Sequence, residues 1–213
     1  MKKFGNYIGV SLIFIGIFFL LHDYFIEKKN KAIENMKLLL LENQPTFKVE
    51  DLNEEVIVKE ENEEVIVKDE TNYIPEIYYY IGFIEIPKIN LKKGFLDINN
   101  KDNNISKNVT VHEYSNYPNI ENGNFILVAH SGTAYISFFK NLYKLDINDL
   151  AYIYYDDYKY TYQISDIYTV DKTGFVNIKR DYDKSTLTLI TCTYHDDYHQ
   201  TVYVAYLIKK EEI

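Results

Sequence analysis

The feature that most constrains this chain is a pair of β-type segments near its C-terminal end. Residues 186–192 read TLTLITC, in which threonine largely alternates with leucine or isoleucine, a pattern typical of a half-buried strand. Residues 201–208 form a second such segment, and the polar residues 194–200 between them predict a hairpin loop. The first segment ends on Cys192, the only cysteine in the sequence. A lone thiol has no disulfide partner within the chain, so Cys192 is either a small buried apolar residue or a reactive group at a strand end.

The chain after residue 73 continues this texture of short β-type runs separated by turn residues. The other expected strands cover residues 78–86, 89–96, 125–129, 151–155 and 159–170. The last two form a hairpin that turns at Asp156 and Asp157, and residues 136–145 have the pattern of one short helix. Seven or eight short strands with a single brief helix predict an all-β fold. We expect it to close, fully or nearly, into a barrel, because closure leaves few bare strand edges.

The N-terminal segment is apolar. Residues 4–21 carry no charged side chain, although a bilayer core needs about 20 apolar residues, so the run is short for a membrane span. A membrane anchor, a cleaved signal peptide and a buried helix are the competing interpretations. No small-residue cleavage site follows and a charged segment does, so we favour an uncleaved signal-anchor over residues 1–26. Lysines flank the run almost equally, and the usual outcome for a signal-anchor is an inside N-terminus with an extracellular C-terminal domain.

Residues 27–72 predict a connection between this anchor and a folded domain. The first part has helical composition and should continue as a stalk until Pro45 ends it. A nine-residue repeat follows, NEEVIVKEE at 53–61 and NEEVIVKDE at 62–70. Most of the net charge of −9 falls in this tract, which favours a solvated tether. The chain has no basic patch of the kind that binds nucleic acid.

A histidine follows one of the apolar strands. Residues 125–129 (FILVA) lead directly into His130. A thiol with an ordinary pKa of about 8.5 is only a few per cent thiolate at neutral pH, so a nucleophilic cysteine needs a neighbouring histidine or other cation. If the two strand ends are adjacent, His130 and Cys192 form such a pair; otherwise His130 is an ordinary core or surface residue. Spacing along the sequence leaves both interpretations open.

Four segments resemble, in the right order, motifs of the sortases, the membrane-anchored cysteine transpeptidases of Gram-positive bacteria. Residues 80–89 (YIGFIEIPKI) are similar to the family's first strand, and residues 124–133 (NFILVAHSGT) to the strand that carries its histidine. Residues 138–142 (FFKNL) resemble the short helix that follows it. Residues 188–192 (TLITC) resemble the TLxTC signature, the most specific of the four. The resemblance covers about residues 78–208, and it leaves the subclass open, with a class B- or D-like enzyme expected.

The resemblance implies an eight-stranded sortase-type β-barrel over residues 73–213, preceded by an N-terminal transmembrane helix. It implies that Cys192 is the nucleophile and His130 its acid–base partner. The thiolate would attack the Thr–Gly bond of an LPXTG-like sorting signal on a secreted protein, and His130 would protonate the leaving amine. An amine of a peptidoglycan precursor or a pilin would then resolve the thioacyl enzyme, which gives ping-pong kinetics. We expect no cofactor and no metal.

One position departs from the family pattern. Sortases carry an arginine on the strand after the cysteine, where it hydrogen-bonds the substrate and the developing oxyanion, and the matching position here is Gln200. A neutral amide supplies no charge, and loss of one well-placed oxyanion donor costs about 10²–10³-fold in rate. The candidates for the role are Gln200 itself, the adjacent His199 and Arg180, the only arginine in the sequence. We expect substitution of Arg180 to slow acylation more than substitution of Gln200, although a plain surface role for Arg180 stays open.

Residues 195–199 hold two imidazoles and two carboxylates, but they lie in one hairpin loop. Metal ligands converge from a rigid scaffold, so we expect a substrate-facing loop here and not a metal site. Three other functions fit the same barrel. They are a sorting-signal-binding domain of weak turnover, a thiol hydrolase that releases its acyl group to water, and an anchored β-domain in which Cys192 is inert.

Overall fold

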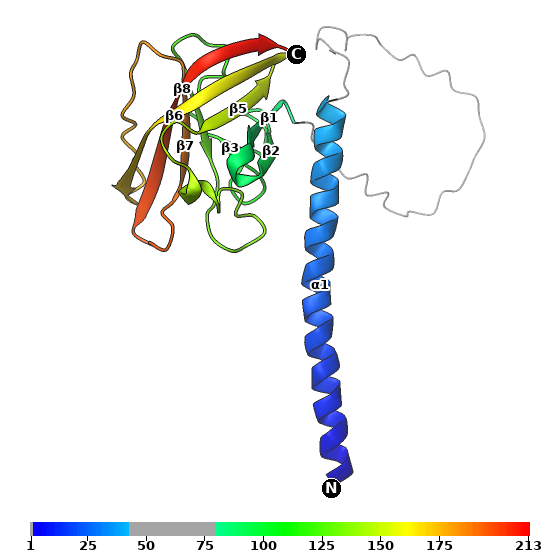
Figure 1. The fold of residues 1–213 in the computed structure, drawn as a ribbon. Helices are drawn as coiled ribbons and strands as arrows, with labels where there is room; N and C mark the ends of the chain where they lie inside the picture. Colours follow the sequence, from blue (N-terminus) through cyan, green and yellow to red (C-terminus); the bar gives the residue numbers. More distant parts are fainter. Residues whose placement is uncertain (1, 43–79) are drawn as a thin grey trace, which may run out of the picture.

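The computed structural model describes residues 2–42 and 80–213 (Figure 1). One long helix, α1 (Lys2–Glu42), spans both the predicted anchor and the predicted stalk. None of the helices in the described part of the chain combines the length and the apolar character that a membrane crossing requires. Pro45, the predicted end of the stalk, and the repeats of residues 53–70 lie outside the described residues.

The second part of the chain is an eight-stranded sheet that curls into a nearly closed barrel (Figure 1). Its strands are β1 (Gly82–Ile86), β2 (Leu91–Phe95), β3 (Thr110–Val111), β4 (Asn124–Val128), β5 (Leu150–Tyr155), β6 (Tyr158–Asp171), β7 (Thr186–Cys192) and β8 (His199–Glu212). They pair in the order β2-β1-β5-β6-β8-β7-β4-β3. The pair β4–β7 is parallel and the other neighbouring pairs are antiparallel. Buried apolar side chains from all eight strands fill the interior, so the predicted all-β barrel is confirmed.

The hairpin between β5 and β6 turns where the sequence predicts it. Asp156 and Asp157 both have positive φ angles, 54° and 62°. Two consecutive residues of this kind form the turn whose twist matches that of paired strands, and aspartate tolerates the left-handed region better than most residues. A short 3₁₀ helix, η2 (Pro87–Ile89), connects β1 to β2.

The prediction of a helix over residues 136–145 is wrong for most of that segment. Turns occupy the segment, and only η3 (Leu142–Lys144) is a short 3₁₀ helix. Phe139 and Leu142 are both fully buried, so their helix-like spacing reflects burial in the barrel and not a continuous helix face. Ser137 donates its hydroxyl to the Ser131 carbonyl at 3.3 Å, a side-chain bond of the kind that competes with helical backbone pairing.

β7 is buried on both faces, whereas its pattern predicted a half-buried strand. Leu187 and Leu189 belong to the barrel interior. On the other face, Ile190 packs in a second buried cluster, and Thr188 donates its hydroxyl to Oδ1 of Asn124 at 2.8 Å. Because that hydroxyl has a partner, a threonine can be buried where the alternation suggested exposure to water.

A side chain closes the gap between the two edge strands, β2 and β3. The N–H of Val111 in β3 donates to Oδ1 of Asn103 at 2.9 Å, and Nδ2 of Asn103 donates to the Val111 carbonyl at 2.8 Å. Nδ2 also lies 3.3 Å from the carbonyl of Ile98, just after β2. The amide of Asn103 therefore pairs with the edge of β3 as a neighbouring strand would.

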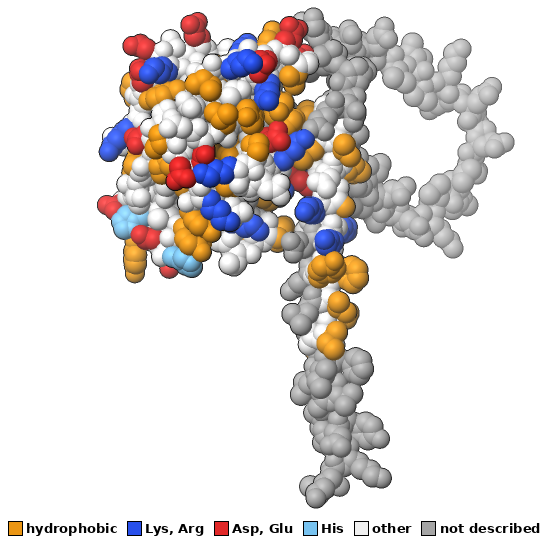
Figure 2. All heavy atoms as spheres, viewed as in Figure 1, with side chains coloured by type: hydrophobic (Ala, Val, Ile, Leu, Met, Phe, Trp, Pro, Cys, Tyr) orange, Lys and Arg blue, Asp and Glu red, His pale blue; other side chains and the backbone are white. Residues whose placement is uncertain are grey.

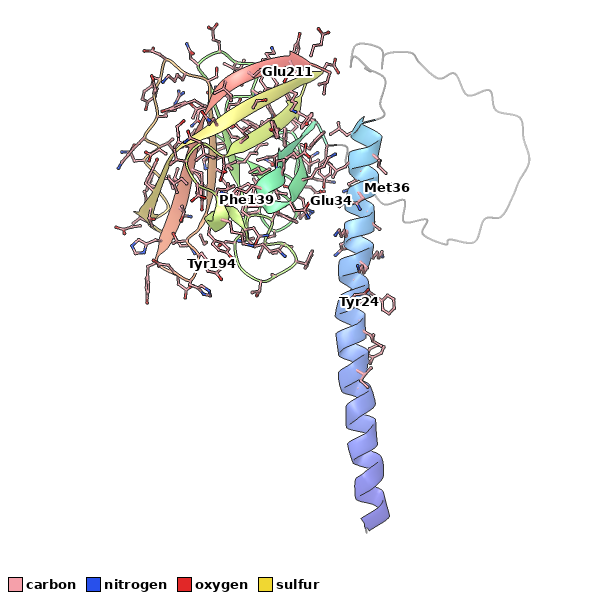
Figure 3. The ribbon with its side chains drawn as sticks, in the orientation of Figure 1. Tyr24, Glu34, Met36, Phe139, Tyr194 and Glu211 are labelled. Atoms are coloured by element: carbon pink, nitrogen blue, oxygen red, sulfur yellow. The ribbon has the colours of Figure 1, made fainter. Side chains whose placement is uncertain are left out.

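The C-terminal half of α1 packs against the outer face of β1 and β2 (Figure 3). Leu38 is buried there beside Tyr80, whose hydroxyl donates to Oε2 of Glu34 at 2.7 Å. Nζ of Lys93 lies 3.6 Å from the other carboxylate oxygen of Glu34. Burial, with Glu34 adjacent, raises the pKa of Tyr80, so its hydroxyl keeps the proton that it donates. The helix is thus attached to the barrel by apolar contact, by one partly buried hydrogen bond and by the Lys93–Glu34 ion pair.

We predict that Asn103→Ala lowers the free energy of unfolding by about 1–3 kcal/mol, because it leaves two backbone groups of Val111 without partners. Denaturant unfolding of the full chain measures this. Asn104→Ala is the matched control, since the Asn104 side chain accepts only one exposed bond, from the N–H of Ser106. Equal losses in the two variants would contradict the edge-closing role of Asn103.

Candidate active site

His130 and Cys192 lie at adjacent strand ends. The last pair in the parallel register of β4 and β7 is Val128 with Ile190. Cys192 ends β7 two residues after Ile190, and His130 lies two residues after Val128, the last residue of β4. The backbones stay together there, since the Ala129 N–H donates to the Ile190 carbonyl at 3.3 Å. Neighbouring strands lie about 4.8 Å apart. The two strand ends that carry these residues are therefore close in space, although the residues are far apart in the sequence.

The backbone around this pair is held by hydrogen bonds between the two strand ends. Ser131 donates its hydroxyl to the carbonyl of Cys192 at 2.8 Å, and Thr191 donates its hydroxyl to the carbonyl of Ala129 at 2.8 Å. The carbonyl of His130 accepts from the N–H of Phe139 at 3.0 Å. Ser131 is a residue that the sequence analysis did not single out, because only the register shows that it reaches Cys192.

Cys192 projects from the outer face of the sheet. Side chains alternate along a strand, and Leu189 points into the barrel whereas Ile190 joins a second cluster on the other face. Cys192 therefore shares the face of Ile190, and His130 lies two residues after Val128, the last residue of β4 and a member of the same cluster. Both side chains are half-buried. We call the apolar surface beside them the outer patch; its partly buried members are Val128, Tyr168, Val170, Val176, Ile178 and Tyr206.

Gln200 lies on the other side of Cys192. The antiparallel register of β7 and β8 pairs Cys192 with Gln200 directly, so the two side chains project from the same face. The register of β6 and β8 then pairs Gln200 with Val170 of the outer patch. The outer face thus carries Cys192 and Gln200, and His130 follows the neighbouring end of β4; we call these three residues the row.

His199 projects from the opposite face, as its place next to Gln200 requires. Its Nδ1 lies 2.7 Å from Oδ2 of Asp196, and its Nε2 lies 3.3 Å from Oδ1 of Asp171. Both ring nitrogens therefore face carboxylates, and neither faces Cys192. Within the described residues, no cluster of histidine, cysteine and acidic side chains could hold a metal ion.

Arg180 lies at the wrong end of β7 for a role beside Cys192. Its Nη1 donates to the carbonyls of Asn122 at 3.0 Å and Lys184 at 3.3 Å, and it lies 3.3 Å from the hydroxyl of Thr186. Thr186 begins β7 and Cys192 ends it, so about 20 Å of extended strand separates the guanidinium from the thiol. The suggestion that Arg180 contacts the oxyanion is contradicted by this placement. The arginine instead binds the carbonyls of the turn that leads into β4.

Two tyrosines that sequence reasoning missed stack beside the site. Tyr143 of η3 and Tyr194, two residues after Cys192, have ring centroids 3.9 Å apart and planes 12° apart. Figure 3 shows Tyr194 at the lower end of the barrel. The neighbouring Tyr143 raises the pKa of Tyr194. The stack connects the segment after His130 to the loop after Cys192, and no spacing in the sequence pairs these two residues.

The profile of the sortase domain matches residues 84–208, which is more than half of the chain and includes the whole row. The chain belongs to the sortase family. Sortases are cysteine transpeptidases, and this sortase has a single cysteine, Cys192. No curated protein matches the sequence.

Solved sortases share this fold. Sortase C1 from Streptococcus agalactiae is 26% identical with a TM-score of 0.54, over 61% of this chain and 68% of that chain. Sortase C1 from Streptococcus suis is 26% identical with a TM-score of 0.55, over 61% and 73%. The sortase D5 transpeptidase of Clostridium perfringens is 26% identical with a TM-score of 0.51, over 62% and 80%. A sortase A from Corynebacterium diphtheriae is also similar, so these neighbours do not distinguish a subclass.

The family resemblance implies that His130 is the acid–base partner of Cys192, and on that expectation we predict that His130→Ala slows alkylation of Cys192 by iodoacetamide about tenfold at neutral pH. Arg180→Ala should change this rate less than twofold, since Arg180 lies at the far end of β7. Cys192 is the only thiol, so intact mass reports its reaction alone. The denatured variants are the control and should all react at one rate. A loss in Arg180→Ala that matches the loss in His130→Ala would contradict the placement of Arg180.

Proposed function

We propose that this protein is a sortase that cleaves an LPXTG-like sorting signal on secreted proteins and transfers the acyl group to an amine acceptor of the cell wall. The observation that supports the proposal is the row of His130, Cys192 and Gln200 at the ends of three adjacent strands, where the Ser131 hydroxyl bonds to the Cys192 carbonyl and the register pairs Cys192 with Gln200. In this proposal the sulfur of Cys192 and the imidazole of His130 come within hydrogen-bond range, where a thiolate–imidazolium pair forms.

In the first half-reaction, the thiolate of Cys192 attacks the carbonyl carbon of the threonine–glycine bond. The amide of Gln200 donates a hydrogen bond to the oxyanion that develops. The carbon–nitrogen bond then breaks, and His130 gives its proton to the leaving amine of glycine. The thioester on Cys192 remains. The outer patch, which adjoins the row through Val128 and Val170, offers apolar surface for the leucine and proline side chains of the signal.

In the second half-reaction, an amine of a peptidoglycan precursor or of a pilin attacks the thioester. His130, now neutral, takes a proton from that amine as the new amide bond forms, and Cys192 leaves as the thiolate. The enzyme returns to its starting state with no cofactor. The two half-reactions share one covalent intermediate, so the kinetics are ping-pong.

The proposed location is the outer face of the cell membrane, with residues 1–26 as an uncleaved signal-anchor, residues 27–72 as stalk and tether, and residues 73–213 as the catalytic domain. The uncharged residues 4–21 support this part of the proposal.

We predict that the full chain sediments with membranes and that a chain without residues 2–26 does not. Equal partition of the two chains in cell fractionation would contradict the anchor.

We predict that a library of LPXTG-type peptides with an excess of amine acceptor yields joined product in the wild type. Cys192→Ala should give neither adduct nor product, because no other thiol can form the thioester. Intact mass spectrometry follows the adduct and the product together. Peptide binding without an adduct would favour the sorting-signal-binding domain. Free acid at saturating amine would favour the thiol hydrolase, and no binding at all would favour the inert β-domain.

Gln200 offers a sharper test in the same assay. Gln200→Arg places a charged donor in the row, and we predict faster acylation, by up to about 10²-fold, because the oxyanion then has a charged partner. Gln200→Ala should slow acylation. Arg180→Ala is the control for Gln200→Ala, because it also removes a long polar side chain. It should leave the acylation rate of the folded protein unchanged. If Gln200→Ala and Gln200→Arg both react at the wild-type rate, Gln200 does not contact the oxyanion.

A further inference from the structure

The segment between β6 and β7 lies against the outer face of the barrel and is not itself a strand of the sheet. Figure 1 shows it running along the side of the barrel, from the end of β6 to the start of β7. Residues 175–180 alternate between exposed and half-buried positions, as an extended segment on a sheet face does. Val176 and Ile178 are two of the half-buried positions, and both belong to the outer patch. We call residues 176–181 the wall.

One phenol gives the wall hydrogen bonds of the kind that a neighbouring strand would supply. The hydroxyl of Tyr168 in β6 accepts the N–H of Lys179 at 2.8 Å and donates to the carbonyl of Asn177 at 3.0 Å. In an extended segment, the carbonyl of one residue and the N–H two positions later point to the same side, so one hydroxyl can serve both. Nζ of Lys179 also lies 5.0 Å from the centre of the Tyr168 ring.

A second phenol holds the other end of the wall. The hydroxyl of Tyr206 in β8 accepts the N–H of Asp181 at 2.8 Å. Tyr206 is the cross-strand partner of Thr186, the first residue of β7, so this bond lies far from Cys192. The wall is therefore attached to β6 at one end and to β8 at the other, through hydroxyl groups on the outer face of the sheet.

The Tyr168 end of the wall is the end nearer to Cys192. Across the sheet, Tyr168 pairs with Val202 of β8, and Val202 pairs with Ile190 of β7. Cys192 lies two residues beyond Ile190 on the same face, which is about 7 Å of strand. Figure 2 shows exposed hydrophobic side chains next to histidines at the lower end of the barrel, the end at which Figure 3 places Tyr194. The wall therefore borders the part of the outer patch that adjoins the row.

On the basis of the proposed function, we propose that Tyr168 is a positioning residue whose hydroxyl holds the wall in place for the sorting signal. The wall then exists before the peptide binds, and binding does not have to order it. The leucine and proline side chains of the signal gain apolar contact from Val176 and Ile178 as well as from the sheet. The hydroxyl acts through the wall, so it changes the affinity for peptide and leaves the reaction at Cys192 unchanged.

Tyr168→Phe removes both hydrogen bonds and keeps the ring in the outer patch. We expect the KM for an LPXTG-type peptide to rise about three- to tenfold, the net effect of one or two hydrogen bonds, with kcat unchanged. Tyr182→Phe is the matched control, because it removes a hydroxyl from a 72% exposed ring of the same loop, and its KM should equal that of the wild type. A wild-type KM in Tyr168→Phe, or a loss in kcat alone, would overturn the proposal.

A change in the peptide distinguishes this role from a general defect in folding. Replacement of the peptide's leucine by alanine removes a side chain that the wall contacts. The ratio of kcat/KM between the wild type and Tyr168→Phe should therefore fall toward one with the altered peptide. Acylation at excess enzyme, followed by intact mass, measures this ratio even for a weakly bound peptide. A ratio that is the same for both peptides indicates a purely structural role and would contradict the proposal.

Amide hydrogen exchange separates this inference from the proposed function, because it needs no turnover. In the full-length Cys192→Ala variant, addition of Tyr168→Phe should speed exchange of the Lys179 N–H about three- to tenfold. Unchanged exchange would overturn the inference even if peptide transfer is observed. Exchange that depends on Tyr168, in a chain that neither binds nor transfers the peptide, would support the attachment of the wall and overturn the proposed function.

Discussion

The parallel pairing of β4 with β7 is the constraint on which the site depends. In a sheet whose other pairs are antiparallel, this one pair makes two strands end at the same edge, where Cys192 is the last residue of β7 and His130 lies two residues after β4. An antiparallel pair would place one of these residues at each end of the barrel. The parallel register brings the two strand ends together, and the hydroxyl bonds of Ser131 and Thr191 then hold the segment with the histidine against the end of β7.

Burial of β7 on both faces gives that pairing its rigidity. The interior cluster covers one face, and the outer patch with the Thr188–Asn124 hydrogen bond covers the other. A strand enclosed in this way cannot shift its register by one residue without exposing leucines and burying unpaired hydroxyls. The register of β7 with its neighbours positions Gln200, Cys192 and the segment that carries His130. The packing that fixes this register therefore also fixes the alignment of the row.

The sequence was sufficient for the barrel, but not for the geometry of the site. Alternation and turn residues located the strands, whereas the loop expected over residues 194–200 left Gln200 outside the strand in which it pairs with Cys192. The prediction of a helix over residues 136–145 was wrong, since the spacing of apolar residues cannot distinguish a helix face from a buried turn. Arg180 was misplaced because its contacts are carbonyls of a distant turn, and backbone acceptors leave no trace in a sequence. The bonds of Asn103 to Val111 and of Ser131 to Cys192 were missed for the same reason, since their partners are backbone groups. The stack of Tyr143 on Tyr194 was missed because no spacing pairs residues so remote in the chain.

The attachment of α1 to the barrel has a geometric consequence. Along the helix axis in Figure 3, Tyr194 lies between Glu34 and Tyr24, and the N-terminal part of α1 continues in the same direction. Thirteen residues of helix from Glu34 back to Leu21 rise about 20 Å. Because the C-terminal half of α1 contacts β1 and β2, a fixed position of residues 4–21 would also restrict the distance and the orientation of the barrel relative to them.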